Sequence, residues 1–185
     1  MPTSDTENKN IVKDWFASIV PTYTIDIGCG EGTYSKLIND DFRHGKWIGI
    51  EAWGPYVNQF ELDKHYNSII IGQAEYINYK KIFDGFCKCG NSLVIMGDML
   101  EHMSKNVAKQ LIDTIKEYAD NIIISVPLLH CHQDPLDGNW FETHVDHWTF
   151  EEMSKHLGEG LVGSVEGHIL GYFMWQKPMK SSEIA

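Results

Sequence analysis

The sequence predicts an α/β fold built on a doubly wound parallel sheet. Five short apolar runs alternate with segments of helical patterning, a glycine-rich loop follows the first run, and acidic residues stand at the ends of the second and fourth runs. Uninterrupted apolar runs are typical of strands buried on both faces of a parallel sheet. Right-handed crossovers then wind the sheet in two directions, and ligands of such sheets bind beyond the carboxyl ends of the strands.

The N-terminal part predicts a single helix. Residues 1–10 are polar and we expect them to be frayed, whereas Ile11, Trp15 and Ile19 recur at helical spacing before Pro21. Two interpretations stay open at this point, because such a helix either caps a binding cleft or only covers the sheet.

The first apolar run leads into the glycine-rich loop. Residues 24–27 predict a strand, glycines follow at positions 28, 30 and 32, and residues 34–38 predict a helix. Alternate glycines let a ligand approach the backbone closely, and the N–H groups that open the next helix present a positive end to it. The dinucleotide fingerprint G-x-G-x-x-G requires glycine where this chain has Thr33, which argues against a dinucleotide.

The second and third runs add further candidate ligand contacts. Residues 46–51 end in Glu51, about twenty residues beyond the loop, where α/β nucleotide sites place a carboxylate that accepts hydrogen bonds from ribose hydroxyls. Trp53 follows, and its ring either packs against an adenine face or belongs to the core. Residues 56–64 predict a helix, and residues 67–72 predict the third strand.

The fourth and fifth runs complete the parallel part of the sheet. Residues 92–98 predict a strand that ends in Asp98, and Ser104 is positioned to cap a helix that ends at Tyr118. Residues 121–127 predict the fifth strand, which ends at a proline.

The C-terminal part predicts one helix and one hairpin. Thr149 and Glu152 form a capping box that opens a helix toward Leu157. Residues 161–165 and 169–175 then predict two strands joined by a tight turn.

Two of these segments resemble the class I S-adenosylmethionine (SAM)-dependent methyltransferases. Residues 24–33 are similar to motif I of that family, and residues 98–102, Asp-Met-Leu-Glu-His, are similar to the Asp-x-Leu-Glu-His run that follows its fourth strand. The resemblance covers residues 21–177. It implies a Rossmann-like sheet of seven strands, mostly parallel with an antiparallel last strand, and helices on both faces.

The resemblance also implies a site for SAM and for the product S-adenosylhomocysteine (SAH). In that family the loop and the acid before it hold the methionine part, the acid ending the second strand binds the ribose, and the third strand leads to the adenine. After the third strand this chain has Gln73 where the family often has Asp, and the amide of Gln73 can still accept a hydrogen bond from the adenine amino group. The cofactor residues expected on this basis are Asp26, Gly28, Cys29, Gly30, Glu51, Ala52, Trp53, Gln73, Ala74, Asp98 and Met99.

Residues 128–148 form the least regular segment, and they are rich in histidine and carboxylate side chains. Long structured loops usually serve function. Three roles stay open for this one: contact with substrate, a divalent metal, or scaffolding as in the Glu-x-His-x-x-x-Trp pattern of related methyltransferases, matched here by residues 142–148. We expect no metal, and we predict His144 as the general base, with His147 and His102 as further candidates.

Composition narrows the possible partners. The net charge of −11 and the pI of about 5.1 disfavour a nucleic-acid substrate and an anionic membrane surface. No apolar stretch approaches the roughly 20 residues that span a bilayer, and the start is not signal-like, so we expect a cytoplasmic protein. The four cysteines are expected to be reduced thiols, since Cys87 and Cys89 lack a second pair at zinc-site spacing.

Taken together, these features predict residues 1–20 as an N-terminal segment with its helix, residues 21–178 as one methyltransferase domain, and residues 179–185 as a disordered tail. The expected reaction is transfer of a methyl group from SAM to an oxygen, nitrogen or carbon atom of a small molecule, by a monomer or homodimer. A SAM-binding protein that cleaves or senses SAM is the main alternative. An NAD(P)-dependent oxidoreductase is a weaker one.

Overall fold

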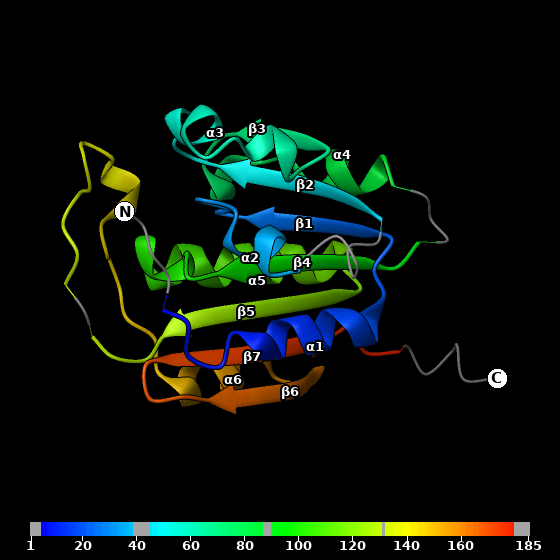
Figure 1. Ribbon diagram of the computed structural model, residues 1–185. Coiled ribbons are helices and arrows are strands. Elements are labelled where there is room, and N and C mark those ends of the chain that lie inside the picture. Colours follow the sequence, from blue (N-terminus) through cyan, green and yellow to red (C-terminus); the bar gives the residue numbers. More distant parts are fainter. Residues whose placement is uncertain (1–4, 39–44, 87–89, 131, 180–185) are drawn as a thin grey trace.

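The computed structural model describes residues 5–38, 45–86, 90–130 and 132–179 of the chain. These residues form one seven-stranded sheet with the strand order β3-β2-β1-β4-β5-β7-β6 (Figure 1). Its strands are β1 (Tyr23–Ile27), β2 (Lys46–Glu51), β3 (Ser68–Ile71), β4 (Ser92–Gly97), β5 (Asn121–Pro127), β6 (Leu161–Glu166) and β7 (Leu170–Gln176).

The direction of the strands confirms the predicted fold class. Strands β1 to β5 pair in parallel, and β7 pairs antiparallel with both β5 and β6. The order reverses at β1, from which the chain winds outward to β3 on one side and returns to β4 on the other. This switch point is where open α/β sheets bind their ligands.

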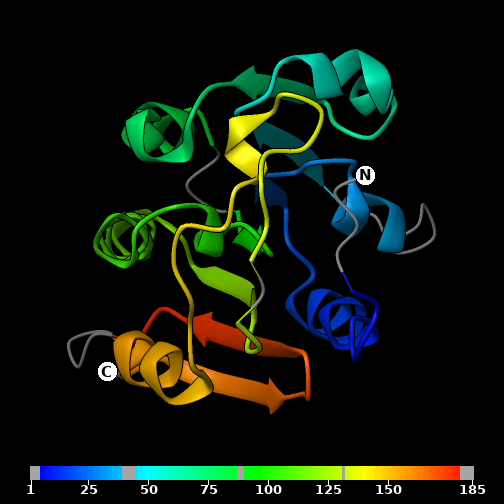
Figure 2. The same ribbon diagram turned by 90° about the vertical axis from the view of Figure 1, so that its left-hand side faces the viewer.

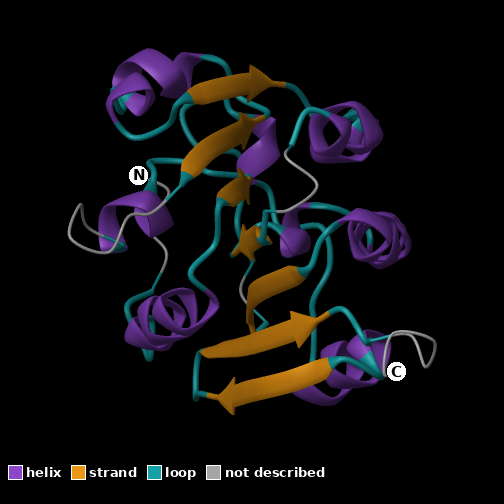
Figure 3. Ribbon diagram, turned by 90° about the vertical axis from the view of Figure 1, so that its right-hand side faces the viewer, coloured by secondary structure: helices purple, strands orange, loops and turns teal. Residues whose placement is uncertain are grey.

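Helices cover both faces of the sheet (Figure 3). One face carries α1, α2 and α3, and the other carries α4, α5 and α6. The helices are α1 (Asn10–Ile19), α2 (Thr33–Leu37), α3 (Pro55–Gln59), α4 (Tyr79–Asp84), α5 (Lys105–Tyr118) and α6 (Phe150–Leu157), with 3-10 turns η1 (Leu62–Lys64), η2 (Ala74–Tyr76), η3 (Leu100–His102) and η4 (Trp140–Glu142).

Apolar side chains fill both layers between helices and sheet. On one side Val12 and Phe16 of α1 pack toward Trp47 of β2, whose ring centroid lies 5.5 Å from that of Phe16. On the other side α5 buries Leu111 and Ile112 against the sheet. Helix α1 therefore covers the sheet, as the second of the two interpretations of the N-terminal helix holds.

The helix expected over residues 56–64 is interrupted. Helix α3 ends at Gln59, Glu61 adopts a left-handed backbone with φ of +51°, and η1 follows. This break brings Leu62 into the core with no exposed surface. Neither proline nor glycine marks the position, so the sequence pattern gives no sign of the interruption.

The cap of α5 also differs from the expectation. Ser104 occupies the N-cap position, but its side chain makes no capping hydrogen bond. The carboxylate of Asp146, from the loop between β5 and α6, accepts the N–H of Lys105 at 2.9 Å instead. The capping box of α6 is present as predicted, between Thr149 and Glu152.

The segment before α1 is anchored from residue 5 onward rather than frayed. The Glu7 carboxylate accepts the backbone N–H groups of residues 168–170, and its carbonyl accepts the hydroxyl of Tyr172 at 2.6 Å. The predicted tail lies mostly outside the described residues, as do Cys87, Cys89 and Cys131. No helix among the described residues is both long and apolar enough to cross a membrane.

The described residues of the loop 128–148 run along the edge where the parallel strands end (Figure 1). Viewed from that side, it crosses from β5 toward α3 (Figure 2). A hydrogen bond of 3.0 Å from the Tyr56 hydroxyl of α3 to the Glu142 carboxylate fastens its far end. The loop thus covers the carboxyl edge of the sheet.

Candidate active site

The glycine loop takes a backbone path that side chains would obstruct. Gly28 has φ of +69°, and a Cβ at this position would lie 2.7 Å from Cβ of Met99. Gly30 has φ of +52°, and the nearest heavy atom to a Cβ there is 4.0 Å away. Residue 28 is therefore glycine because the segment after β4 packs against it. Gly30, by contrast, faces open space that a ligand can fill.

Glu51 ties the loop to the end of β2. One carboxylate oxygen accepts the N–H of Gly30 at 2.8 Å, and the other accepts the N–H of Trp53 at 2.8 Å. Burial raises the pKa of Glu51, while these two N–H groups oppose that shift. Each oxygen keeps a further lone pair, so the carboxylate can accept additional hydrogen bonds from a ligand.

Asp98 lies at the end of β4 in a strained conformation, with φ of +51°. Its carboxylate accepts the Ser125 hydroxyl of β5 at 2.5 Å and forms an ion pair of 3.6 Å with Lys9. Burial raises the pKa of Asp98, and Lys9 opposes the shift. Backbone strain of this kind is concentrated at functional sites.

A cavity of about 400 Å³ lies beyond the carboxyl ends of β1, β2 and β4. This volume is within the range of small-molecule sites. The structure brings most of the sequence-predicted residues to its wall, namely Gly28, Cys29, Gly30, Glu51, Ala52, Gln73, Ala74, Asp98, Met99, His102 and His144.

Three predicted site residues do not line this cavity. Asp26 points into the interior, where it accepts the Tyr66 hydroxyl at 2.6 Å, and its expected role in orienting the cofactor stays a prediction. Burial raises the pKa of Asp26 to about 7, against the effect of the Tyr66 hydrogen bond. Trp53 contributes its backbone to Glu51, and its ring lies outside the wall.

His147 is the third. It lines a second cavity of about 260 Å³ together with His130 and His132. Its ring centroid lies 5.6 Å from that of His130. Glu101 and His144 line both cavities, so they stand between the two.

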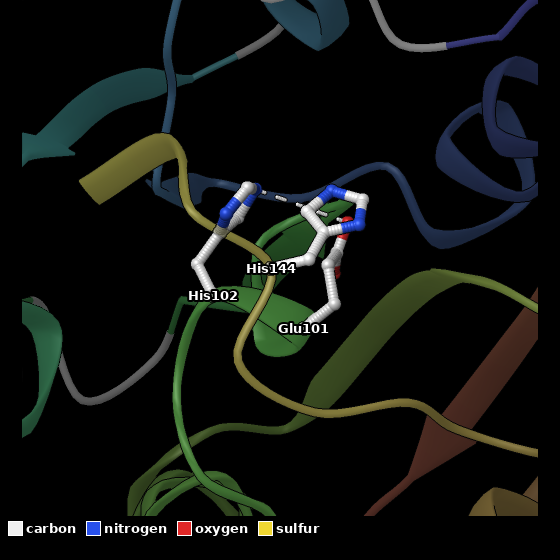
Figure 4. Close-up of side chains that lie close together, drawn as sticks. All are labelled: Glu101, His102 and His144. Atoms are coloured by element: carbon white, nitrogen blue, oxygen red, sulfur yellow. Dashed lines mark ion pairs between the residues drawn. The ribbon is translucent and has the colours of Figure 1, made fainter. Parts of the chain in front are cut away.

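Glu101, His102 and His144 converge at this junction (Figure 4). One potential ligand atom from each of the three side chains lies within 4.8 Å of the others, and the two imidazole centroids are 5.0 Å apart. Burial and the nearby Asp98 raise the pKa of Glu101 well above its usual range. Burial lowers the pKa of His102 to about 4, which leaves its imidazole neutral at neutral pH.

That lowered pKa bears on the predicted catalytic roles. A general base works best with a pKa near the operating pH. His102 is therefore a weak base, although a neutral imidazole is well suited to bind a metal.

The sequence did not predict the positions of Glu142 and Lys9. Glu142 lines the cavity and accepts the Tyr56 hydroxyl, and Lys9 forms an ion pair with Asp98 of the cavity wall. The sequence pattern placed Glu142 at the start of the Glu-x-His-x-x-x-Trp motif, but nothing in it indicated a hydrogen bond with Tyr56. For Lys9, the only signal was a cation just before an apolar helix, and such a residue is usually exposed.

No protein-family model and no curated protein matches the sequence. Solved structures do match. An O-methyltransferase family protein from Burkholderia thailandensis aligns with a TM-score of 0.65 and 12% identity, over 93% of this chain and 55% of that one. The N-terminal domain of EvdMO1 with SAH bound gives 0.63 and 9%, over 94% and 82%. A SAM-dependent methyltransferase from Aquifex aeolicus gives 0.61 and 15%, over 92% and 90%.

This chain has the class I methyltransferase fold. It spans little more than half the length of the Burkholderia protein, and identities in this range establish the shared fold alone. In this methyltransferase fold the glycine loop, Glu51 and Asp98 occupy three neighbouring strand ends.

Proposed function

We propose that this chain is a SAM-dependent methyltransferase that acts on a small molecule. The observation that carries the proposal is Glu51, whose two oxygens are held by the N–H groups of Gly30 and Trp53 at the wall of the cavity. This arrangement holds a carboxylate beside an open glycine loop. A ligand with a ribose could bind the carboxylate, and its methionine part could lie against the loop.

The residues present fit SAM. The space above Gly30 would take the methionine part, Glu51 the ribose hydroxyls, and Gln73 with Ala74 the adenine. When bound, SAM supplies a methyl group that its sulfonium already activates. The chain's own contribution is then to hold the acceptor in line and to exclude water, which the covering loop of residues 128–148 supports.

The acceptor is expected at the end of the cavity that His102, His144 and Phe141 line. A small molecule is favoured because the covering loop limits this end of the cavity and the net charge of −11 would repel a phosphate backbone. His144 faces this space, and it is either a general base for the acceptor or a ligand for an ion that binds it.

Transfer of radiolabel from methyl-labelled SAM to a fractionated cell extract tests the proposal. We expect label in the fraction below about 1 kDa, since the cavity has the size of a small-molecule site. Label in protein or nucleic acid would contradict the small-molecule assignment. Loss of SAM without any labelled acceptor would favour the SAM-cleaving alternative, and SAM binding without turnover would favour a sensor.

A further inference from the structure

We propose that Glu101, His102 and His144 bind a divalent transition-metal ion at the junction of the two cavities. We further infer that this ion binds an oxygen atom of the acceptor. The metal site stands on the geometry of the three side chains, whereas the role of the ion toward the acceptor rests on the proposed methyltransferase function.

The three side chains come from two separate segments and point toward one another (Figure 4). Glu101 and His102 belong to η3 after β4, and His144 belongs to the covering loop. Their potential ligand atoms lie within 4.8 Å of one another. Atoms that bind one ion at about 2.1 Å in a tetrahedral arrangement lie about 3.4 Å apart, so small side-chain rotations suffice to close the site.

The tautomer of His102 follows from its neighbour. Nδ1 lies 3.2 Å from the carbonyl oxygen of Thr143, and a carbonyl can only accept, so Nδ1 carries the proton. Nε2 therefore presents a lone pair, and it lies 4.0 Å from Oε1 of Glu101. A ring whose other nitrogen donates to a backbone carbonyl is the usual state of a metal-binding histidine.

Glu101 supplies the second, independent observation. Its side chain is 4% exposed, and its Oε2 has no hydrogen-bond partner among the described residues. Within that part of the chain, its one contact with a basic side chain is the 4.0 Å approach of His102, which is an ion pair only when the imidazole is protonated. A buried carboxyl group without a cation is costly to ionise, and a bound metal ion would remove that cost.

The backbone holds the third ligand in place. The carbonyl of Glu101 accepts the N–H groups of Val145 and Asp146 at 2.8 and 3.1 Å, and the N–H of His144 donates to the carbonyl of Gln133 at 3.1 Å. The two bonds to Glu101 fasten the loop directly to η3, and the bond to Gln133 fixes His144 within the loop. His144 is thus fixed opposite Glu101 by main-chain contacts that do not depend on its ring.

The donor set indicates the class of metal. Two imidazole nitrogens and one carboxylate oxygen suit Zn²⁺, Fe²⁺, Co²⁺ or Mn²⁺ better than Mg²⁺ or Ca²⁺, which prefer oxygen ligands. Three protein ligands leave positions open for a further ligand. Because the site adjoins the acceptor end of the cavity, an acceptor hydroxyl could take such a position, and its proton would pass more readily to water. The substrate class inferred is therefore a hydroxyl-bearing small molecule.

Calorimetric titration of chelator-treated protein with ZnCl₂, MnCl₂ and MgCl₂, in the absence of SAM, tests the metal site. We expect about one equivalent of Zn²⁺ or Mn²⁺ to bind, and Mg²⁺ to bind more weakly. Glu101→Gln and His144→Ala should each weaken Zn²⁺ binding at least tenfold. His168→Ala is the matched control, because His168 is exposed on the turn after β6 and should leave binding unchanged.

SAH binding by the same variants separates misfolding from loss of a ligand, since a folded variant retains the cofactor part of the cavity. Absence of a stoichiometric site in the wild-type protein would overturn the metal proposal and leave His144 as the candidate base. Zn²⁺ binding that persists unchanged in both ligand variants would also overturn it. Metal binding without any SAH binding would instead contradict the proposed function and leave the metal site standing.

Discussion

At the scale of single residues, Asp26 shows that the face of the sheet to which a side chain points determines what it contacts. It stands between Ile25 and Ile27 in β1, and its side chain reaches Tyr66 rather than the cavity. Sequence placed the carboxylate at the right strand end. It could not tell which face of the sheet the side chain occupies, because both faces of β1 are buried.

The raised pKa of Asp26 predicts a pH-dependent stability. With a pKa of about 7 in the folded protein and an ordinary value when unfolded, Asp26 holds a proton between about pH 4 and 7 that the unfolded chain releases. The wild-type free energy of unfolding should therefore fall relative to Asp26→Asn as pH rises through this window, by up to about 1.4 kcal/mol per pH unit. Urea titrations at several pH values measure the difference.

The exposed Asp14→Asn variant of α1 is the control for the loss of an aspartate. A free-energy difference between wild type and Asp26→Asn that stays constant from pH 4 to 7 would contradict the buried, protonated state of Asp26.

At the scale of elements, the loop of residues 128–148 organises the cavity through contacts that reach across the chain. Tyr56 of α3 holds Glu142, Glu101 of η3 holds Val145 and Asp146, and Asp146 in turn caps α5. The loop, which contains the 3-10 turn η4, is thereby fixed at three points. The composition and irregularity of this segment predicted that it is functional. They did not predict the contacts that fix it, because Asp146 and Glu142 bind residues that are 41 and 86 positions away in the sequence.

The cap of α5 gives a prediction at this scale. Asp146→Ala should lower the free energy of unfolding by about 0.5–1 kcal/mol, since it removes an N-terminal cap that is partly exposed to solvent. Ser104→Ala should change it by less, because the Ser104 side chain makes no capping bond. Thermal or chemical denaturation of the two variants compares them directly. A larger loss of unfolding free energy in Ser104→Ala would contradict this account and favour Ser104 as the capping side chain.

At the scale of the whole molecule, the fold was predictable because its signals are local. Short sequence patterns predict each element: the apolar runs predict strands, the glycine loop predicts a turn, and the capping box of Thr149 predicts a helix start. The right-handed crossover rule then predicts how these elements form one sheet. The site was predictable in part, since strand ends converge at one edge. The junction of Glu101, His102 and His144 was not, because only the path of the covering loop brings His144 to the end of β4.

The central claim is that the 400 Å³ cavity binds SAM through Glu51. Calorimetric titration with SAH tests it most directly. We expect micromolar binding by the wild-type protein, weakened by about 1–3 kcal/mol in Glu51→Ala, the usual range for losing a charged hydrogen-bond partner. Glu166→Ala is the matched control, because this exposed acid also ends a strand and lies outside the cavity wall. Absence of SAH binding, or equal affinity in Glu51→Ala, would contradict the account.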